Sequence, residues 1–113
     1  MVKQYVPEAG DIVWLEFDPQ AGREQAGRRP AIVLTPEVYN KKTNLMICCP
    51  LTTQIKGYPF EVLVEVDGVQ SVVLADQVKS LDWKIRKAKF KTKVRLEVLT
   101  EVRAKAKSLL SIS

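Results

Sequence analysis

Short apolar runs, separated by polar and turn-forming residues, follow one another through the first two thirds of the chain. The runs are rich in β-branched and aromatic residues, a composition typical of strands. They predict five strands, at residues 12–17, 31–35, 45–49, 60–66 and 69–75. Asp67 and Gly68 lie between the last two runs, and this pair favours a tight hairpin turn. Much of the chain is therefore predicted to form an antiparallel sheet.

The hydrophobic pattern changes its period towards the end of the chain. Residues 88–96 alternate between basic and less polar side chains, which predicts a sixth strand. A two-residue period would bring four cations to one sheet face: Lys89, Lys91, Lys93 and Arg95. From Glu97 to Leu110, apolar residues recur every three or four positions, so an amphipathic helix is expected. Together these elements predict a mainly β fold of the α+β class, a small antiparallel barrel that the C-terminal helix closes at one end.

The composition is that of one globular domain spanning residues 1–113. Hydrophobic residues make up 46% of the chain and charged residues 27%, which are ordinary proportions for a folded domain. No apolar run reaches the roughly 20 residues of a membrane span, and the first residues lack the apolar core of a signal peptide. We therefore expect a cytoplasmic protein with no membrane partner. Cys48 and Cys49 are expected to be free thiols, because adjacent Cα atoms lie closer than disulfide geometry allows.

The sequence contains no histidine. Imidazole is the only side chain whose ordinary pKa lies near neutral pH. Ser-His-Asp triads, Cys-His dyads and metal sites that need His ligands are therefore excluded within this chain. Any catalysis must use carboxylate, Arg, Lys, Tyr, Thr, Ser or Cys side chains.

The net charge of +5 is unevenly distributed. Residues 1–83 carry 8 basic and 11 acidic side chains, whereas residues 84–113 carry 10 basic and 2 acidic ones. Such a basic block favours a polyanionic partner, because binding would release counterions from that partner. A solvated strand face kept soluble by lysine would show the same pattern, so charge alone leaves both interpretations open.

Two polar loops, at residues 24–30 and 50–59, flank buried runs. The core holds the ends of such loops while their tips are exposed, so they are common places for binding and catalysis. If the second and third predicted strands pair antiparallel, the start of one lies beside the end of the other. Arg29 would then lie near Thr52, and a guanidinium, a hydroxyl and a carboxylate could meet.

Three separate blocks in these loops and strands share their order and spacing with one protein family. They comprise residues 10–14, 17–19 and 24–31, then residues 49–62, and finally residues 73–81. Over residues 5–83 this arrangement resembles the MazF/PemK family of toxin endoribonucleases. The helix near the end fits the family as well, although its residues match less closely.

The resemblance implies a fold, an activity and partners. Family members are small SH3-like barrels similar to the CcdB toxin, and they form homodimers. They cleave single-stranded mRNA at short preferred sequences without a metal or other cofactor, which inhibits translation and growth. The 2′-OH of the RNA attacks, leaving a 2′,3′-cyclic phosphate and a 5′-OH. A MazE-type antitoxin inhibits them by laying an acidic, flexible segment in the RNA groove.

The resemblance also assigns catalytic residues. The catalytic arginine falls on Arg29, the catalytic threonine on Thr52 and an upstream acid on Glu24. Arg29 offers a rigid fork of donors for phosphate oxygens, Thr52 offers a hydroxyl donor, and Glu24 is the candidate base for the 2′-OH. Close relatives often carry His where this chain has Arg28. If that His transfers protons, Glu24 and Arg29 must do so here; if it only shapes the phosphate site, which we favour, Arg28 can replace it.

Further residues of the same blocks are candidates for holding or reading RNA. Gln, Asp and Glu side chains can read base edges, aromatic rings can stack on bases, and Lys can hold phosphates. The candidates are Arg28, Phe17, Thr53, Gln54, Lys56, Tyr58, Glu61, Asp76, Gln77 and Lys79. Structural roles stay open for some of them, because Tyr58 could close a turn and Asp76 could cap the next segment. Trp14 is expected in the core rather than at the RNA.

Two other functions fit parts of the pattern. A non-catalytic nucleic-acid-binding SH3-like barrel would explain the basic strand, but it would not require Glu24 beside an Arg-Arg pair. A CcdB-like gyrase-poisoning toxin would share the barrel, but it acts through a partner-binding C-terminus. The loop blocks favour the endoribonuclease.

Overall fold

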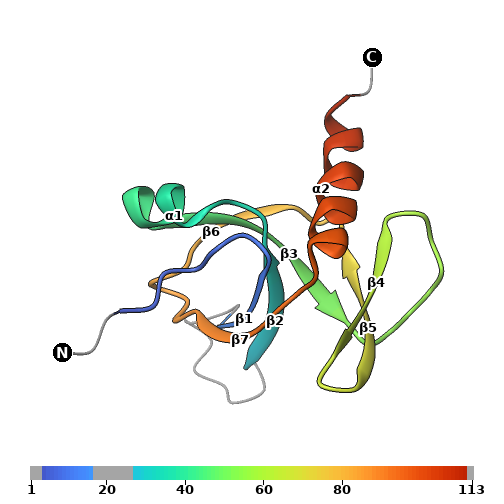
Figure 1. Cartoon of the computed structure of the whole chain (residues 1–113), viewed down its shortest axis with the longest axis horizontal. Helices are drawn as coiled ribbons and strands as arrows, with labels where there is room; N and C mark the ends of the chain where they lie inside the picture. Colours follow the sequence, from blue (N-terminus) through green and yellow to red (C-terminus); the bar gives the residue numbers. More distant parts are fainter. Residues whose placement is uncertain (1–3, 17–26, 112–113) are drawn as a thin grey trace.

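The computed structural model describes residues 4–16 and 27–111, which form one curled antiparallel sheet and two helices (Figure 1). In chain order the elements are β1 (Asp11–Glu16), β2 (Arg28–Val33), α1 (Glu37–Thr43), β3 (Leu45–Thr52), β4 (Glu61–Val66), β5 (Val69–Leu74), β6 (Lys79–Asp82), β7 (Lys89–Lys93) and α2 (Leu96–Leu110). The mainly β fold with a C-terminal helix is confirmed. Neither helix is long and apolar enough to cross a membrane.

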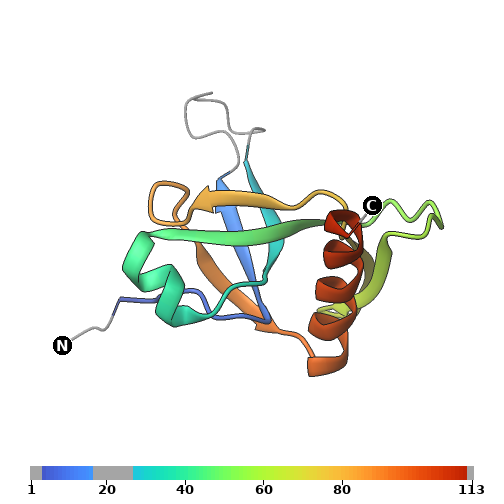
Figure 2. The same cartoon turned by 90° about the horizontal axis from the view of Figure 1, so that it is seen from above.

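The sheet is an open half-barrel whose central strand is β3. The strands follow the order β4-β5-β3-β2-β1-β7, and β6 pairs separately with the first half of β3. In the view from above, α1 lies at one end of this half-barrel and α2 at the other, beside β4 and β5 (Figure 2). This arrangement leaves β3 in contact with both ends of the molecule.

The core lies on both faces of the central strands. Consecutive residues of one strand enter different clusters: Cys49 packs with Leu51, Val73 and α2, whereas Cys48 packs with Met46 and Trp83. Successive side chains of a strand point to opposite faces. Burial on both faces explains why β1 to β3 appear in the sequence as apolar runs rather than as alternating patterns.

Two elements were not predicted. The short helix α1 and the strand β6 both lie in segments without a clear period. The strand β2 also begins at Arg28, three residues before the predicted start, so that Pro30 is its third residue. Pro30 pairs across to Trp14 on β1, while pairing with β3 begins only at the next residue.

A bulge in β7 overturns the prediction that its cations share one face. Lys91 is the extra residue of β7 where the register against β1 shifts. Lys89 therefore pairs with Trp14, and Lys93 pairs with Asp11. Since Trp14 and Asp11 are three positions apart, they lie on opposite faces of β1.

The remaining cations of this segment have separate surroundings. Lys91 forms an ion pair with Asp67 at 2.6 Å and lies 4.6 Å from the centre of the Trp14 ring. Arg95 lies outside the strand, at the N-cap of α2. The basic block is therefore divided among different parts of the surface.

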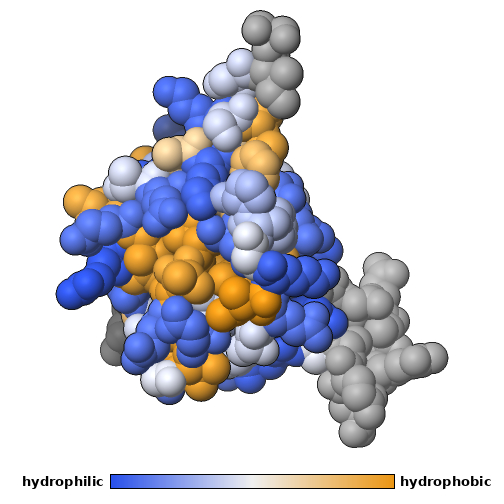
Figure 3. Space-filling model, turned by 90° about the vertical axis from the view of Figure 1, so that its right-hand side faces the viewer, coloured by the Kyte–Doolittle hydropathy of each residue, from blue (hydrophilic) through white to orange (hydrophobic). Residues whose placement is uncertain are grey.

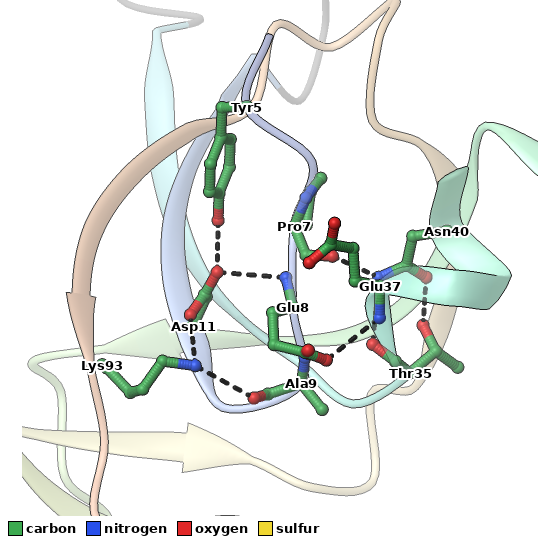
Figure 4. Close-up of polar contacts among 9 residues, drawn as sticks. All are labelled: Tyr5, Pro7, Glu8, Ala9, Asp11, Thr35, Glu37, Asn40 and Lys93. Carbon is green, nitrogen blue, oxygen red and sulfur yellow. Dashed lines mark hydrogen bonds and ion pairs between the residues drawn. The ribbon is translucent and has the colours of Figure 1, made fainter. Parts of the chain in front are cut away.

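Buried polar side chains tie the N-terminal segment to the sheet (Figure 4). Asp11 is 3% exposed, and it accepts the Tyr5 hydroxyl at 2.5 Å and the Glu8 N–H at 3.0 Å. Lys93 forms an ion pair with Asp11 at 2.7 Å. Burial and the bond to Asp11 raise the pKa of Tyr5 far above its ordinary range. Asp11 therefore joins the N-terminal segment, β1 and β7.

Asn40 explains why α1 forms where the sequence shows no helical pattern. Its side chain is fully buried, and its amide donates to the carbonyls of Pro7 at 2.8 Å and Thr35 at 2.9 Å. Its amide oxygen accepts the Thr35 hydroxyl at 2.7 Å (Figure 4). The Trp83 indole N–H donates to the Asn40 carbonyl at 2.9 Å. A polar network rather than an apolar stripe therefore anchors this short helix.

We expect Asn40→Ala to lower the free energy of unfolding by about 2–4 kcal/mol. The substitution removes three hydrogen bonds and leaves buried carbonyl and hydroxyl groups without this partner. Urea unfolding followed by circular dichroism would measure the change. Lys42→Ala, an exposed position of the same helix, should change stability by less than about 0.5 kcal/mol. Equal stability of the two variants would contradict the anchoring role.

Cys48 and Cys49 are free thiols, as predicted, and the structure shows that both are buried. Burial is the main cause that raises the pKa of each thiol to about 12. At pH 8 we expect both thiols to react with an aromatic disulfide reagent at least roughly 100-fold more slowly in the folded protein than in urea, because the thiolate is the nucleophile. Fast labelling of the native protein would contradict their burial.

The same shift predicts a pH dependence of stability. The unfolded thiols have a pKa near 9 and the folded ones near 12, so folding favours the neutral form. Their stabilising contribution should be complete below pH 9 and should decline as the pH rises from 9 towards 12. Urea midpoints measured across this range, with Cys48→Ala as the comparison, would test it.

Candidate active site

The pairing of β2 with β3 brings Arg29 and Thr52 to one cleft. The strands are antiparallel with Ala31 opposite Pro50. The same register continued for two more residues, beyond the last paired position, leads to Arg29 on one strand and Thr52 on the other. Both residues line a cavity of about 370 Å³. The structure therefore brings together the guanidinium and the hydroxyl that the sequence suggested.

Two prolines explain why a cleft opens at this point. The ladder between β2 and β3 ends at Ala31 and Pro50, and Pro30 is the next residue of β2. Proline has no N–H to donate, so a ladder cannot continue fully through these positions. Beyond them the two strands present side chains to the cavity instead of bonds to each other.

Five strands, β2 to β6, line the cleft together with the loop of residues 53–60. Its described lining residues are Arg29, Pro50, Leu51, Thr52, Gln54, Lys56, Tyr58, Glu61, Leu74, Gln77 and Lys79. Eight of them are sequence-predicted site residues. Three carry positive charge, from β2, the loop and β6, while one is a carboxylate. The cleft is therefore suited to an anionic ligand.

Thr52 is oriented by a bond to the loop that follows it. Its hydroxyl oxygen accepts the Gln54 N–H at 3.1 Å, the geometry of a small hydroxyl turn. A hydroxyl that accepts in this way still has its own hydrogen to donate. Thr52 can thus offer a neutral donor to a phosphate in the cleft.

Tyr58 connects the loop to the end of β5. Its hydroxyl donates to the Asp76 carboxylate at 2.8 Å, and this bond is the main cause that raises the pKa of Tyr58. The phenol therefore stays neutral at physiological pH. Asp76 itself is exposed beside the cleft.

Two predicted RNA-binding residues lie away from this cleft. Arg28 precedes Arg29 on β2 and so points to the opposite face, where its guanidinium lies 5.5 Å from the centre of the Trp14 ring. Thr53 lines a second cavity of about 210 Å³ beside Trp14 and Lys91. Trp14 is half-buried under two cations rather than in the core.

The candidates Phe17 and Glu24 lie outside the described residues. Among residues 4–16 and 27–111, no group of three or more His, Cys, Asp or Glu side chains could hold a metal ion.

Sequence reasoning missed one residue that contacts the site from α2. The Lys105 ammonium donates to the carbonyl of Glu61 at 2.9 Å and lies 3.4 Å from the Glu101 carboxylate. The i,i+4 spacing of Glu101 and Lys105 is visible in the sequence, but it indicates only an ion pair on the helix surface.

Known proteins are similar to this chain in sequence and in fold. A family model described as "PemK-like, MazF-like toxin of type II toxin-antitoxin system" matches residues 8–110. The endoribonuclease toxin MazF of Escherichia coli strain K12 is 51% identical over 110 residues, which cover 97% of this chain and 99% of that protein. The endoribonuclease PemK of Escherichia coli is 32% identical over 113 residues, with coverage of 92% and 82%.

Solved structures agree with these relatives. A MazE–MazF crystal structure from Deinococcus radiodurans superposes with a TM-score of 0.84 at 50% identity, covering 97% of this chain and 100% of that chain. The Mycobacterium tuberculosis toxin MazF-mt6 has a TM-score of 0.72 at 18% identity, with coverage of 91% and 98%, which supports the fold alone. The enzyme class predicted from the loop blocks, an endoribonuclease, is confirmed by the close relatives. The chain belongs to the MazF/PemK family of type II toxin–antitoxin toxins.

Proposed function

We propose that this toxin cleaves single-stranded mRNA at short preferred sequences in the cleft of Arg29 and Thr52, without a metal. The substrate's own 2′-OH attacks the adjacent phosphorus, and the 5′-oxygen of the next nucleotide leaves. The products carry a 2′,3′-cyclic phosphate and a 5′-OH. The observation that carries this proposal is the antiparallel register that brings both donors to one cationic cleft. Cleavage of mRNA in the cytoplasm would inhibit translation and growth.

Each catalytic residue has a distinct task in this reaction. Arg29 and Thr52 donate to the phosphate oxygens as charge accumulates on the pentacoordinate phosphorus. Glu24, assigned from the sequence, takes the proton of the 2′-OH. Water can return a proton to the leaving oxygen, because a guanidinium with a pKa above ~12 is a weak acid.

RNA binding is divided between phosphates and bases. Lys56 and Lys79 line the cleft with Arg29 and hold neighbouring phosphates. Gln54 and Gln77 present amide groups that can read base edges. The cleft therefore supplies both affinity and sequence preference.

A second copy and an acidic partner complete the proposal. Apolar surface gathers on the side that carries β4, β5 and α2, surrounded by polar side chains (Figure 3). Leu63 on β4 is 57% exposed and Ile55 in the adjoining loop is 45% exposed. This surface is suited to a homodimer contact. The relative from Deinococcus radiodurans was solved with MazE, and an acidic segment of such an antitoxin would compete with RNA for the cations of the cleft.

Mapping the ends of cleaved RNA tests the chemistry. Purified protein incubated with single-stranded RNA in excess chelator should give discrete cuts with 5′-OH ends. A 2′-deoxy sugar at the nucleotide 5′ to the cut should abolish that cut, because the attacking hydroxyl is missing. RNA bound but left intact would favour a non-catalytic binding barrel. Cleavage that survives the 2′-deoxy substitution would overturn the proposed nucleophile.

We expect Arg29→Ala to slow cleavage by at least roughly 100-fold, about 2.7 kcal/mol in activation free energy, the usual effect of losing one transition-state donor. Single-turnover kinetics with a fluorogenic RNA would measure it. Lys42→Ala, which removes an exposed cation from α1, is the matched control and should cleave at the wild-type rate. Near-normal cleavage by Arg29→Ala would contradict the assignment.

A further inference from the structure

We propose that Glu61 is a positioning residue, which fixes the backbone of the cleft loop, rather than a side chain that reads RNA bases. The inference rests on the proposed RNA cleavage and deepens it. It concerns how the loop of residues 53–60 holds Lys56 in the cleft.

Both carboxylate oxygens of Glu61 are used by the loop. One accepts the N–H of Gly57 at 2.8 Å, and the other accepts the N–H of Lys56 at 3.0 Å. Glu61 is 9% exposed. Base reading by these oxygens would compete with two charge-assisted hydrogen bonds that already satisfy them.

The loop has the backbone shape that binds an anion. Two successive N–H groups converge on one carboxylate, and Gly57 has a left-handed φ of +84°. This is the arrangement of an anion-binding nest, which in other proteins holds phosphates. Here an internal carboxylate occupies it, so the nest shapes the loop instead of binding substrate.

Glu61 is itself held from three directions. Its N–H donates to the Tyr58 carbonyl at 3.1 Å, which closes the loop on the start of β4. Its carbonyl accepts the Lys105 ammonium of α2 at 2.9 Å. Across the strand pair it lies opposite Leu74 of β5, another lining residue of the cleft. The sheet and the helix therefore fix the carboxylate, and the carboxylate fixes the loop.

The consequence concerns Lys56, which lines the cleft with Arg29 and Thr52. The position of its ammonium depends on its backbone, and its N–H is one of the two that Glu61 holds. Loss of the carboxylate should therefore misplace a phosphate-binding cation. The base contacts should stay, because the Thr52 hydroxyl holds the Gln54 N–H and Gln77 lies outside the loop.

The first test is Glu61→Gln, with Glu65→Gln as its matched control. Glu65 lies four residues further along β4, on the same strand face, and is exposed. A glutamine at 61 has one acceptor oxygen and would turn its own N–H₂ towards a loop N–H. We expect cleavage to fall roughly 10-fold to 100-fold at the same bonds of a mixed-sequence RNA. The control should cleave as the wild type does.

Amide hydrogen exchange gives a readout that needs no RNA. The N–H groups of Lys56 and Gly57 should exchange roughly tenfold faster in Glu61→Gln than in the wild type. In the control Glu65→Gln, the N–H groups of Lys56 and Gly57 should exchange at wild-type rates. In Glu61→Gln itself, the amides of β1 should also exchange at wild-type rates. General loss of the fold would instead raise exchange in β1 as well.

Gly57→Ala disturbs the same nest without changing the carboxylate. A Cβ at this position would meet no atom within 4 Å, so the change acts through the left-handed backbone alone. We expect slower cleavage at unchanged bonds, as in Glu61→Gln. The double variant should be less impaired than the product of the two single effects, because both disrupt one loop conformation.

Several results would overturn the inference. A changed set of cut sites in Glu61→Gln would make Glu61 a base reader. Unchanged exchange of the Lys56 and Gly57 amides in Glu61→Gln would show that the carboxylate does not hold the loop. Cleavage by Glu61→Gln at the wild-type rate would show that fixing the loop does not matter for activity. If the wild-type protein cut no RNA, the proposed function would fail, whereas the exchange result would still decide the structural role of Glu61.

Discussion

The pairing of β3 with three other strands is the constraint on which the rest of the structure depends. Within eight residues β3 pairs with β6, then with β2, and finally with β5. A slip of one residue between β2 and β3 would exchange the faces of all side chains on β2. Arg28 would then face the cleft and Arg29 would face Trp14. The identity of the cleft arginine is therefore a property of strand register, and the prolines at 30 and 50 mark where that register ends and the cleft begins.

The parts of the fold that sequence reasoning predicted are those whose signal is local. Apolar runs marked the strands, Asp67 and Gly68 marked the hairpin between β4 and β5, and the three-to-four spacing marked α2. The juxtaposition of Arg29 with Thr52 needed one further assumption, antiparallel pairing of neighbouring strands, which is the usual arrangement for short connections. Residue roles inside the cleft came from the family resemblance rather than from any local pattern.

The remaining features depend on partners distant in the sequence. Asn40 anchors α1 through groups up to 43 residues away, so a seven-residue segment with a polar interior shows no helical period. The bulge at Lys91 depends on the register against β1, which alternation within β7 cannot reveal. Glu61 resembles any acidic residue at the start of a strand until the loop folds back onto it. In each case the long-range contact, not the local propensity, decides the structure.

Charge distribution along the sequence is a poor guide to charge distribution around the site. The basic surplus belongs to residues 84–113, yet the cleft cations Arg29, Lys56 and Lys79 all come from residues 1–83, where acids outnumber bases. Three lysines of the basic segment instead form ion pairs with acidic side chains: Lys91 with Asp67, Lys93 with Asp11 and Lys105 with Glu101. The acidic side chain in the cleft is turned towards loop N–H groups, which offset its charge locally. The field that an anionic ligand would meet in the cleft thus depends on where the fold neutralises its acidic side chains as much as on where it gathers its basic ones.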